Sequence, residues 1–228
     1  MTHVTITKKD IMKGIYIDFE GNVDMAPTLL GAYYIERETR HLKLTQYVHE
    51  TKFRSTVRRY PKCTFLNLND TFEQLAELAY REGRYFFAWS SREKDAISML
   101  IKNHDLREYV LSHLIDCKKL AKKWKRRYRP NVEIPYITGQ GRHRLSEYAN
   151  LINYSIPTRA VGGNTGENLR YVRGQLQNHS NRYLDITNLA KKRWENVLIH
   201  NEHDCKSMRE VAKTAILDLN ECRLPVAA

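Results

Sequence analysis

Short apolar runs alternate with polar segments in the first fifty residues. Residues 14–20 (GIYIDFE) are rich in β-branched and aromatic side chains, which is typical of a buried strand. Residues 29–37 and 42–48 are two further apolar runs with a short polar gap between them, a pattern that predicts an antiparallel hairpin. Together the three runs predict a meander of three consecutive strands.

Helical periodicity alternates with another strand in the next fifty residues. Residues 71–82 carry an apolar stripe that Asp70 can cap, and residues 85–89 (YFFAW) predict a fourth buried strand. Residues 92–102 predict a second helix. A strand-helix-strand-helix order after a meander predicts an α/β domain with a mixed sheet flanked by helices.

The second half of the chain is mainly helical in pattern. Residues 106–128 predict a helix that ends in a basic run, and the prolines that follow predict a loop. We expect one domain over residues 1–228, with a loop and helical insertion at about 129–182. The remaining predicted helices are 144–152, 167–178 and 183–219.

The charge balance points to a polyanionic partner. The chain has 38 Lys and Arg against 26 Asp and Glu, a net charge of +12 and a pI near 9.5. Basic proteins of this kind commonly bind nucleic acid, although charge alone also fits a merely soluble or ribosome-associated surface.

Cellular location and cysteine chemistry follow from two further patterns. No window approaches the ~18–20 apolar residues of a membrane-spanning helix, and the first residues lack a signal-peptide core, so we expect a cytoplasmic protein without membrane contact. The cysteines form no C-x-x-C pair, which favours reduced thiols over a zinc site or a disulfide framework. They are Cys63, Cys117, Cys205 and Cys222.

Two acids on the first strand are candidate metal ligands. Asp18 and Glu20 are two residues apart, so on a strand they point to the same side. Side by side in so apolar a run, they would repel each other unless a cation lay between them, and Mg²⁺ prefers oxygen ligands. Alternatively, Asp18 only ends the strand and Glu20 begins a solvated turn.

A third acid lies on the last predicted helix. His200 and Asp204 are four residues apart and therefore share one helical face. That face continues through Met208, Val211 and Ala215, which places the pair on or beside the inward stripe. The alternative is that His200 and Asp204 only pair with each other or cap the helix.

The fourth acid is either Glu93 or Asp95. Glu93 directly follows the YFFAW strand, which places it near the end of the sheet where the first two acids emerge. Asp95 would point about 200° away on a helix, so the two cannot serve together. Glu93 also completes a capping box with Ser90, in which its side chain only bonds to the helix start. We favour Glu93.

These segments, in this order, resemble the Asp-Glu-Asp-Asp exonuclease superfamily. The closer similarity is to the ribonuclease H-like branch of predicted exonucleases found beside RecB-type nuclease domains, and it spans about residues 14–213. The similar stretches are GIYIDFEG with LLGAYYI, FFAWSSREKDAISML, LIDCKKLAKKW with Asp116 in the aspartate position, RLSEYANLINYSIP, and WENVLIHNEHDCKSMREVA.

The resemblance implies a fold, a reaction and a set of roles. It implies a ribonuclease H-like fold with a mixed five-stranded sheet, and a 3′–5′ exonuclease that acts on single-stranded DNA or RNA with two Mg²⁺ or Mn²⁺ ions. Asp18 would contact both ions, Glu20 and Asp204 would each favour one, and Glu93 would act through water. His200 stands where the branch usually has tyrosine; it could accept a proton, with His203 a weaker candidate.

Basic and aromatic residues complete the expected nucleic-acid surface. Two clusters could contact the phosphate backbone, although a basic run is also compatible with a solvated helical face. Trp89, Tyr60 or Tyr128 could stack on bases, but core packing is the stronger expectation for each. The basic candidates are Arg54, Arg58, Arg59, Lys122, Lys125, Arg126 and Arg127.

Two other functions use the same residues. A catalytically silent, nuclease-like module would bind nucleic acid without cleaving it. A structure-selective endonuclease would use the same acids and differ in how the groove around the substrate closes.

Overall fold

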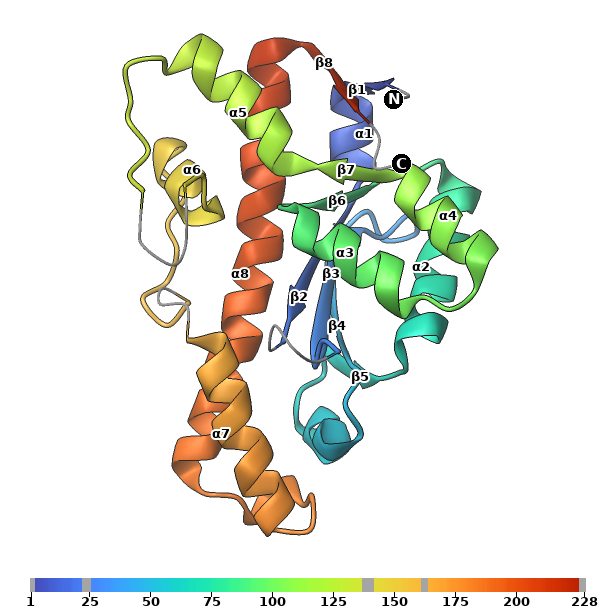
Figure 1. The fold of residues 1–228 in the computed structure, drawn as a ribbon, viewed down its shortest axis with the longest axis vertical. Helices are drawn as coiled ribbons and strands as arrows, with labels where there is room; N and C mark the ends of the chain where they lie inside the picture. Colours follow the sequence, from blue (N-terminus) through green and yellow to red (C-terminus); the bar gives the residue numbers. More distant parts are fainter. Residues whose placement is uncertain (1–2, 22–25, 137–141, 161–163, 226–228) are drawn as a thin grey trace.

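The computed structural model describes residues 3–21, 26–136, 142–160 and 164–225. Its centre is a six-stranded mixed sheet in the order β5-β4-β3-β2-β6-β7 (Figure 1). The strands are β2 (Ile15–Glu20), β3 (Leu29–Ile35), β4 (Leu42–Val48), β5 (Cys63–Phe65), β6 (Phe86–Ala88) and β7 (Leu114–Asp116).

The predicted meander is confirmed. Strand β2 pairs antiparallel with β3, and β3 pairs antiparallel with β4, while the β4–β5, β2–β6 and β6–β7 pairs are parallel. The α/β class with a mixed, helix-flanked sheet is therefore confirmed. The expected strand number of five was wrong, because β5 adds a parallel edge strand beside β4.

Helices cover both faces of this sheet (Figure 1). From β4 to α5 each strand is followed by one or two helices, as expected for an α/β protein. They are α1 (Lys8–Lys13), η1 (Thr51–Arg59), α2 (Leu68–Glu82), α3 (Ser91–Leu100), α4 (His104–Ser112), α5 (Cys117–Tyr128), α6 (Leu145–Leu151), α7 (Thr165–Asn178), η2 (Tyr183–Asp185) and α8 (Asn188–Leu219), with η1 and η2 being 3₁₀ helices.

Alternation along β2 divides the core into two layers. Ile15 and Ile17 pack in a cluster with side chains of α2, α3 and α4. Tyr16 points the other way, into a cluster built from α5, α6 and α8. Asp18 and Glu20 continue the Tyr16 side by the two-residue period of a strand, which turns them toward α8.

Several boundaries differ from the sequence predictions. Helix α2 begins at Leu68, and Asn67 caps it by accepting a hydrogen bond from the Asp70 amide (2.9 Å), so Asp70 lies in the first turn. An acid there still suits the positive end of the helix dipole. Strand β7 interrupts the segment 106–128 that was predicted as one helix, and η1 occupies a stretch without a regular pattern.

The ends of the described chain form a second, two-stranded sheet. Strand β1 (His3–Thr7) pairs antiparallel with β8 (Glu221–Pro225), a pairing that the sequence did not predict. Cys222 and Leu224 of β8 are buried in the same cluster as Tyr16. The small sheet therefore extends the core on the α8 side.

The predicted insertion at about 129–182 contains α6 and α7. Both helices pack against α8, and α7 lies along its N-terminal part (Figure 1). Residues 137–141 and 161–163 of that segment lie outside the described residues. None of the helices that the described residues form has the length and apolar character needed to cross a membrane.

Candidate active site

Strand β2 carries two buried carboxylates at one edge of the sheet. Asp18 is 9% exposed and Glu20 is 5% exposed, and both lie on the face that α8 covers. The backbone around them is fixed, since Glu20 pairs with Leu29 in β3 and its carbonyl accepts a hydrogen bond from the Thr28 amide (2.9 Å). Glu20 thus belongs to the strand rather than to a solvated turn.

Helix α8 brings His200 and Asp204 to these carboxylates. The His200 Nε2 atom lies 3.8 Å from Glu20 Oε1 and 3.5 Å from Asp204 Oδ2. Its Nδ1 atom lies 2.7 Å from the Ala160 carbonyl oxygen, so Nδ1 carries the proton and donates it there. The imidazole therefore presents Nε2 between an acid of the sheet and an acid of the helix.

Glu93 joins the group from the start of α3. Its carboxylate accepts hydrogen bonds from the Ser90 amide (3.1 Å) and the Ser90 hydroxyl (2.9 Å), which completes the capping box. At 7% exposure it is buried, and its charge acts on both Asp18 and Glu20. Asp95 is exposed. Capping the helix and facing the acids are thus compatible roles for Glu93.

Two amide side chains beside Asp18, those of Asn201 and Gln46, were not predicted from the sequence. Asn201 donates from Nδ2 to both the carbonyl oxygen and Oδ2 of Asp18 (3.0 Å each), while its Oδ1 accepts from Gln46 Nε2 (3.0 Å). Asn201 is fully buried, and Gln46 is almost fully buried. Asn201 stands at helical spacing between buried Val197 and Cys205, and a polar residue in an apolar stripe was the available signal.

Glycine at position 31 makes room for this amide. Gly31 pairs with Asp18 across the β2–β3 ladder. A Cβ atom at Gly31 would lie 2.3 Å from Asn201 Oδ1 and 2.9 Å from Cys205 Sγ. The close approach of α8 to the sheet, and hence the contact between Asn201 and Asp18, depends on the missing side chain.

All four carboxyl groups have raised pKa values. Burial is the largest cause for each, because a buried carboxylate loses its hydration. The charges of Glu20 and Asp204 raise the pKa of Asp18 further, and Asp204 does the same to Glu20. The acids repel one another, so the site has a deficit of positive charge.

His200 relieves part of this deficit. Burial lowers the pKa of His200, but the Asp204 carboxylate, the Ala160 carbonyl and the Asp18 carboxylate together outweigh burial and leave the pKa above its usual value. The charge of His200 in turn lowers the pKa of Asp204 against the effect of burial. His203 belongs elsewhere: its Nδ1 lies 3.2 Å from the Tyr154 hydroxyl, and its pKa is lowered, chiefly by burial.

The chemistry of the donor set fits a hard divalent cation. Four carboxylates from β2, α3 and α8 offer oxygen ligands, and a cation among them would offset the repulsion that adds to the raised pKa values of Asp18 and Glu20. Over the ranges that the structure describes, however, no three His, Cys, Asp or Glu side chains form a group already arranged to hold a metal ion.

The basic candidates fall into two separate clusters. Arg54, Arg58 and Arg59 are exposed on η1. The α5 candidates Lys122, Arg126 and Arg127 are exposed and Lys125 is half-buried, because α5 turns Leu120, Ala121 and Trp124 inward. In Figure 1 α5 and η1 lie near opposite ends of the molecule, so a single short ligand cannot contact both.

Three aromatic side chains and Asp116 have structural contacts. Trp89 is buried and donates to the His143 carbonyl oxygen (3.1 Å), and the Tyr60 hydroxyl bonds to that of Tyr183 (2.5 Å). The Tyr128 hydroxyl donates to the Asp218 carbonyl oxygen. Asp116 caps α5 by accepting from the Lys119 amide (3.0 Å).

Comparison with models of known protein families, with curated proteins and with solved structures finds no match to this chain.

Proposed function

We propose that the protein is a metal-dependent nuclease that hydrolyses phosphodiester bonds, acting as a 3′–5′ exonuclease on single-stranded DNA or RNA. The observation that carries this proposal is the convergence of four acids, Asp18, Glu20, Glu93 and Asp204, from three elements that are far apart in the sequence. Buried carboxylates without a strong cationic partner are costly, and functional sites are where such costs are usually retained.

The arrangement of the sheet supports the same proposal. Three antiparallel strands, β4, β3 and β2, are followed across the sheet by the parallel pair β6 and β7. This order is compatible with the ribonuclease H-like fold that the sequence resembles. Glu20 is the last residue of β2, and Glu93 follows the carboxyl end of the neighbouring parallel strand β6, where α/β sheets commonly bind their ligands.

The four acids would hold the divalent ions. Bound Mg²⁺ or Mn²⁺ supplies charge neutralisation at the phosphate and makes water a stronger nucleophile at neutral pH. Asn201 holds one Asp18 oxygen in place through its Nδ2, and Ser90 holds one Glu93 oxygen. These bonds orient ligands that would otherwise rotate freely, as outer-sphere partners do in metal sites.

His200 is placed to accept a proton at Nε2. Its Nδ1 is committed to the Ala160 carbonyl, which fixes the tautomer and aims Nε2 at the carboxylates. A divalent cation among the carboxylates would offset their negative charge, which otherwise stabilises the protonated imidazole. The neutral imidazole would then be available as a general base.

The test is cleavage of end-labelled single-stranded DNA and RNA by the purified protein in Mg²⁺, Mn²⁺ or EDTA. We expect shortening from the 3′ end that needs the metal. Replacing a residue that only hydrogen-bonds to a metal ligand typically lowers activity by roughly 10–100-fold. Since Asp18 would itself be a ligand, the cleavage rate of Asp18→Asn should fall by more than that.

A second readout is independent of cleavage. Mn²⁺ or Mg²⁺ should raise the unfolding temperature of the wild type and leave that of Asp18→Asn almost unchanged, because a ligand stabilises only the state that binds it. Nucleic-acid binding with neither cleavage nor a metal-induced shift would favour the catalytically silent module. Internal cleavage of circular strands would favour the endonuclease.

A further inference from the structure

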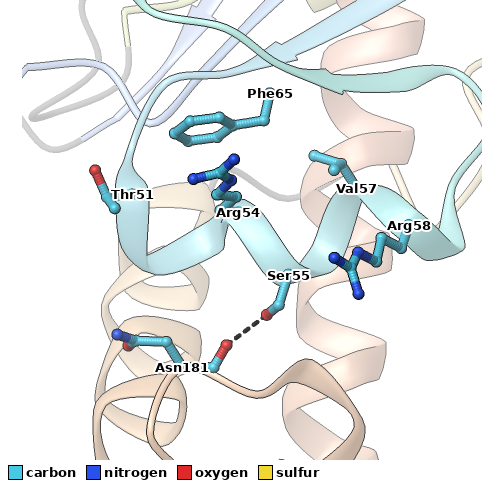
Figure 2. Close-up of a pocket in the computed structure, with 7 residues that line it drawn as sticks. All are labelled: Thr51, Arg54, Ser55, Val57, Arg58, Phe65 and Asn181. Atoms are coloured by element: carbon cyan, nitrogen blue, oxygen red, sulfur yellow. Dashed lines mark hydrogen bonds between the residues drawn. The ribbon is translucent and has the colours of Figure 1, made fainter.

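An open pocket lies where η1 meets β5 and the turn after α7. Its volume is about 480 Å³, and its walls include Arg54, Arg58, Phe65 and Asn181. Figure 2 shows the Arg54 guanidinium beneath the Phe65 ring and Arg58 on the next turn of η1. The pocket combines positive charge with an aromatic surface.

Hydrogen bonds fix the two sides of the pocket relative to each other. The Ser55 hydroxyl donates to the Asn181 carbonyl oxygen (2.6 Å) and accepts from the Tyr183 amide (3.1 Å). Phe65 holds the Arg54 guanidinium, whose carbon lies 5.2 Å from the ring centroid. The walls therefore exist without a ligand, and little ordering would be needed on binding.

The charge of the pocket is not neutralised locally. The η1 segment TKFRSTVRR contains four basic residues and no acidic one. Glu50, which precedes it, is bound by Arg173 (2.7 Å) and Thr28 (3.0 Å). Within the ranges described by the structure, no carboxylate pairs with Arg54 or Arg58. Both arginines are thus available to an external anion.

The pocket lies on the same edge of the sheet as the acidic site. Glu20 pairs with Leu29, and Leu29 pairs with Val48 at the end of β4. Two strand spacings separate Val48 from Glu20, which is roughly 10 Å. Helix η1 begins three residues later, at Thr51. A nucleic-acid strand whose end lies at the acids can therefore reach this pocket after a few nucleotides.

We propose that this pocket is a subsite for an unpaired nucleotide of single-stranded DNA or RNA. Arg58 binds a phosphate, and a base stacks on the guanidinium of Arg54, because guanidinium planes are common stacking partners of unpaired bases. The placement of the strand's 3′ end at the carboxylates rests on the proposed nuclease function. Binding of a nucleotide in the pocket does not rest on it.

The phosphate contact is tested by affinity measured in EDTA, where no cleavage occurs. Single-stranded DNA and RNA of about 16 nucleotides are suitable, the upper end of the length that one single-strand site covers. Arg58→Gln should reduce the slope of log affinity against log salt concentration by about 0.7, the value for one phosphate contact on a single strand.

The matched control is Arg37→Gln. Arg37 is an exposed arginine in the turn between β3 and β4, at the opposite end of these strands, so the variant makes the same change in net charge. It should leave the slope unchanged. Equal losses in Arg58→Gln and Arg37→Gln would overturn the inference, because affinity would then depend on total charge alone.

The stacking contact is tested by Arg54→Lys, which keeps the charge. It should lower affinity for ordinary strands by about fivefold or more, the factor that corresponds to the lower limit of ~1 kcal/mol for stacking of one base. An abasic strand should bind the variant and the wild type equally. Equal losses on both strands would contradict stacking at Arg54.

The outcomes separate this inference from the proposed function. If affinity depends on the pocket but no metal-dependent cleavage occurs, the nuclease proposal is rejected and the subsite is retained. If cleavage occurs but Arg58→Gln has no effect on binding, the subsite is rejected and the nuclease proposal is retained. If polyglutamate binds through Arg58 and nucleic acid does not, the pocket recognises acidic protein and the inference fails.

Discussion

Asp18 and Gly31 face each other across β2 and β3, and the side chain of Asn201 fills the space above them. The position of the Asp18 carboxylate therefore depends on a residue that has no side chain. This dependence leads to a prediction about stability and cleavage together.

Gly31→Ala should destabilise the protein and disturb the acidic site. The new Cβ would lie 2.3 Å from Asn201 Oδ1, and relieving such overpacking typically costs ~1–3 kcal/mol. Urea unfolding measures the loss, and cleavage should fall because the amide that orients Asp18 is displaced. Gly174→Ala is the matched control: a Cβ atom added there in α7 would enter open space, and alanine should stabilise the helix by up to ~1 kcal/mol.

The carboxylate at position 18 should destabilise the metal-free protein at neutral pH. Its pKa is raised in the folded state, so the folded state binds its proton more tightly than the unfolded state does. The stabilisation that this tighter proton binding gives the folded state is fully present below the ordinary carboxyl pKa of about 4. It is lost as the pH rises through the raised pKa of Asp18. In EDTA, Asp18→Asn should therefore unfold at a higher temperature than the wild type at neutral pH.

The same comparison at low pH supplies the control. As the pH falls toward about 4, the wild-type carboxyl group becomes protonated in the folded state and the advantage of Asp18→Asn should shrink. Thermal unfolding followed by circular dichroism across this range measures both variants. An advantage that is constant with pH would show that the charge of Asp18 is not its cause.

The sequence could reveal only those side chains of the site that share a local pattern. Asp18 and Glu20 share a strand face and His200 and Asp204 share a helix face, so spacing alone grouped each pair. The bond between Gln46 and Asn201 joins residues 155 positions apart, and no local pattern encodes it. Asn201 could be noticed only as a polar residue in an apolar stripe.

At the scale of elements, the start of α3 combines two functions in one side chain. Glu93 caps the helix through Ser90 and also faces the acids of β2. Gln can replace Glu in a capping box because its carbonyl oxygen also accepts the backbone hydrogen bond. The two functions can therefore be separated by one substitution.

Glu93→Gln should keep the stability of α3 and lose metal-dependent activity. We expect the free energy of unfolding in EDTA to equal or exceed that of the wild type, since the raised pKa of Glu93 shows that its ionised form is disfavoured by burial. Cleavage should fall by ~10-fold or more, as for other groups that act on a metal through water. Asp95→Asn, on the same helix but exposed, should leave both quantities unchanged.

The elements that the sequence predicted are those with a recognisable local pattern, including the short strand β6, whose three residues lie within the apolar run 85–89. The strands of the meander and helices α2, α3 and α8 each present enough residues for a period to be recognised. Strands β5 and β7 have three residues each and lie in segments whose hydrophobic pattern predicted no strand, so their partners in the sheet determine them. The β1–β8 pair depends on contacts between residues far apart in the chain, which local periodicity does not reveal.

At the scale of the whole molecule, α8 connects otherwise separate regions. It packs against α7 toward one end and α5 toward the other, and it contacts β2 and β3 between them (Figure 1). The basic face of α5 therefore lies far from η1 and from its pocket. The distance between these basic clusters predicts how binding depends on strand length.

Substitution of Lys122 and Arg126 by glutamine should affect only long strands. Both residues are exposed on α5, so a strand long enough to follow the molecule can contact them, whereas one of about 16 nucleotides held at η1 cannot. For the long strand the double variant should lower the salt slope by about 1.4, which corresponds to two phosphate contacts. If the double variant lowered the salt slope equally for short and long strands, the short strand would have to contact α5 rather than η1.

Cys205 directly follows Asp204, and its thiol is buried where α8 packs against Gly31 of β3. Burial raises the pKa of this thiol well above its ordinary value, so an alkylating reagent can react with it only during moments when the helix separates from the sheet. The rate of modification at Cys205, resolved by mass spectrometry, therefore reports how often that contact opens. If the carboxylates hold a divalent ion as proposed, adding Mg²⁺ or Mn²⁺ should make those openings rarer and slow the modification.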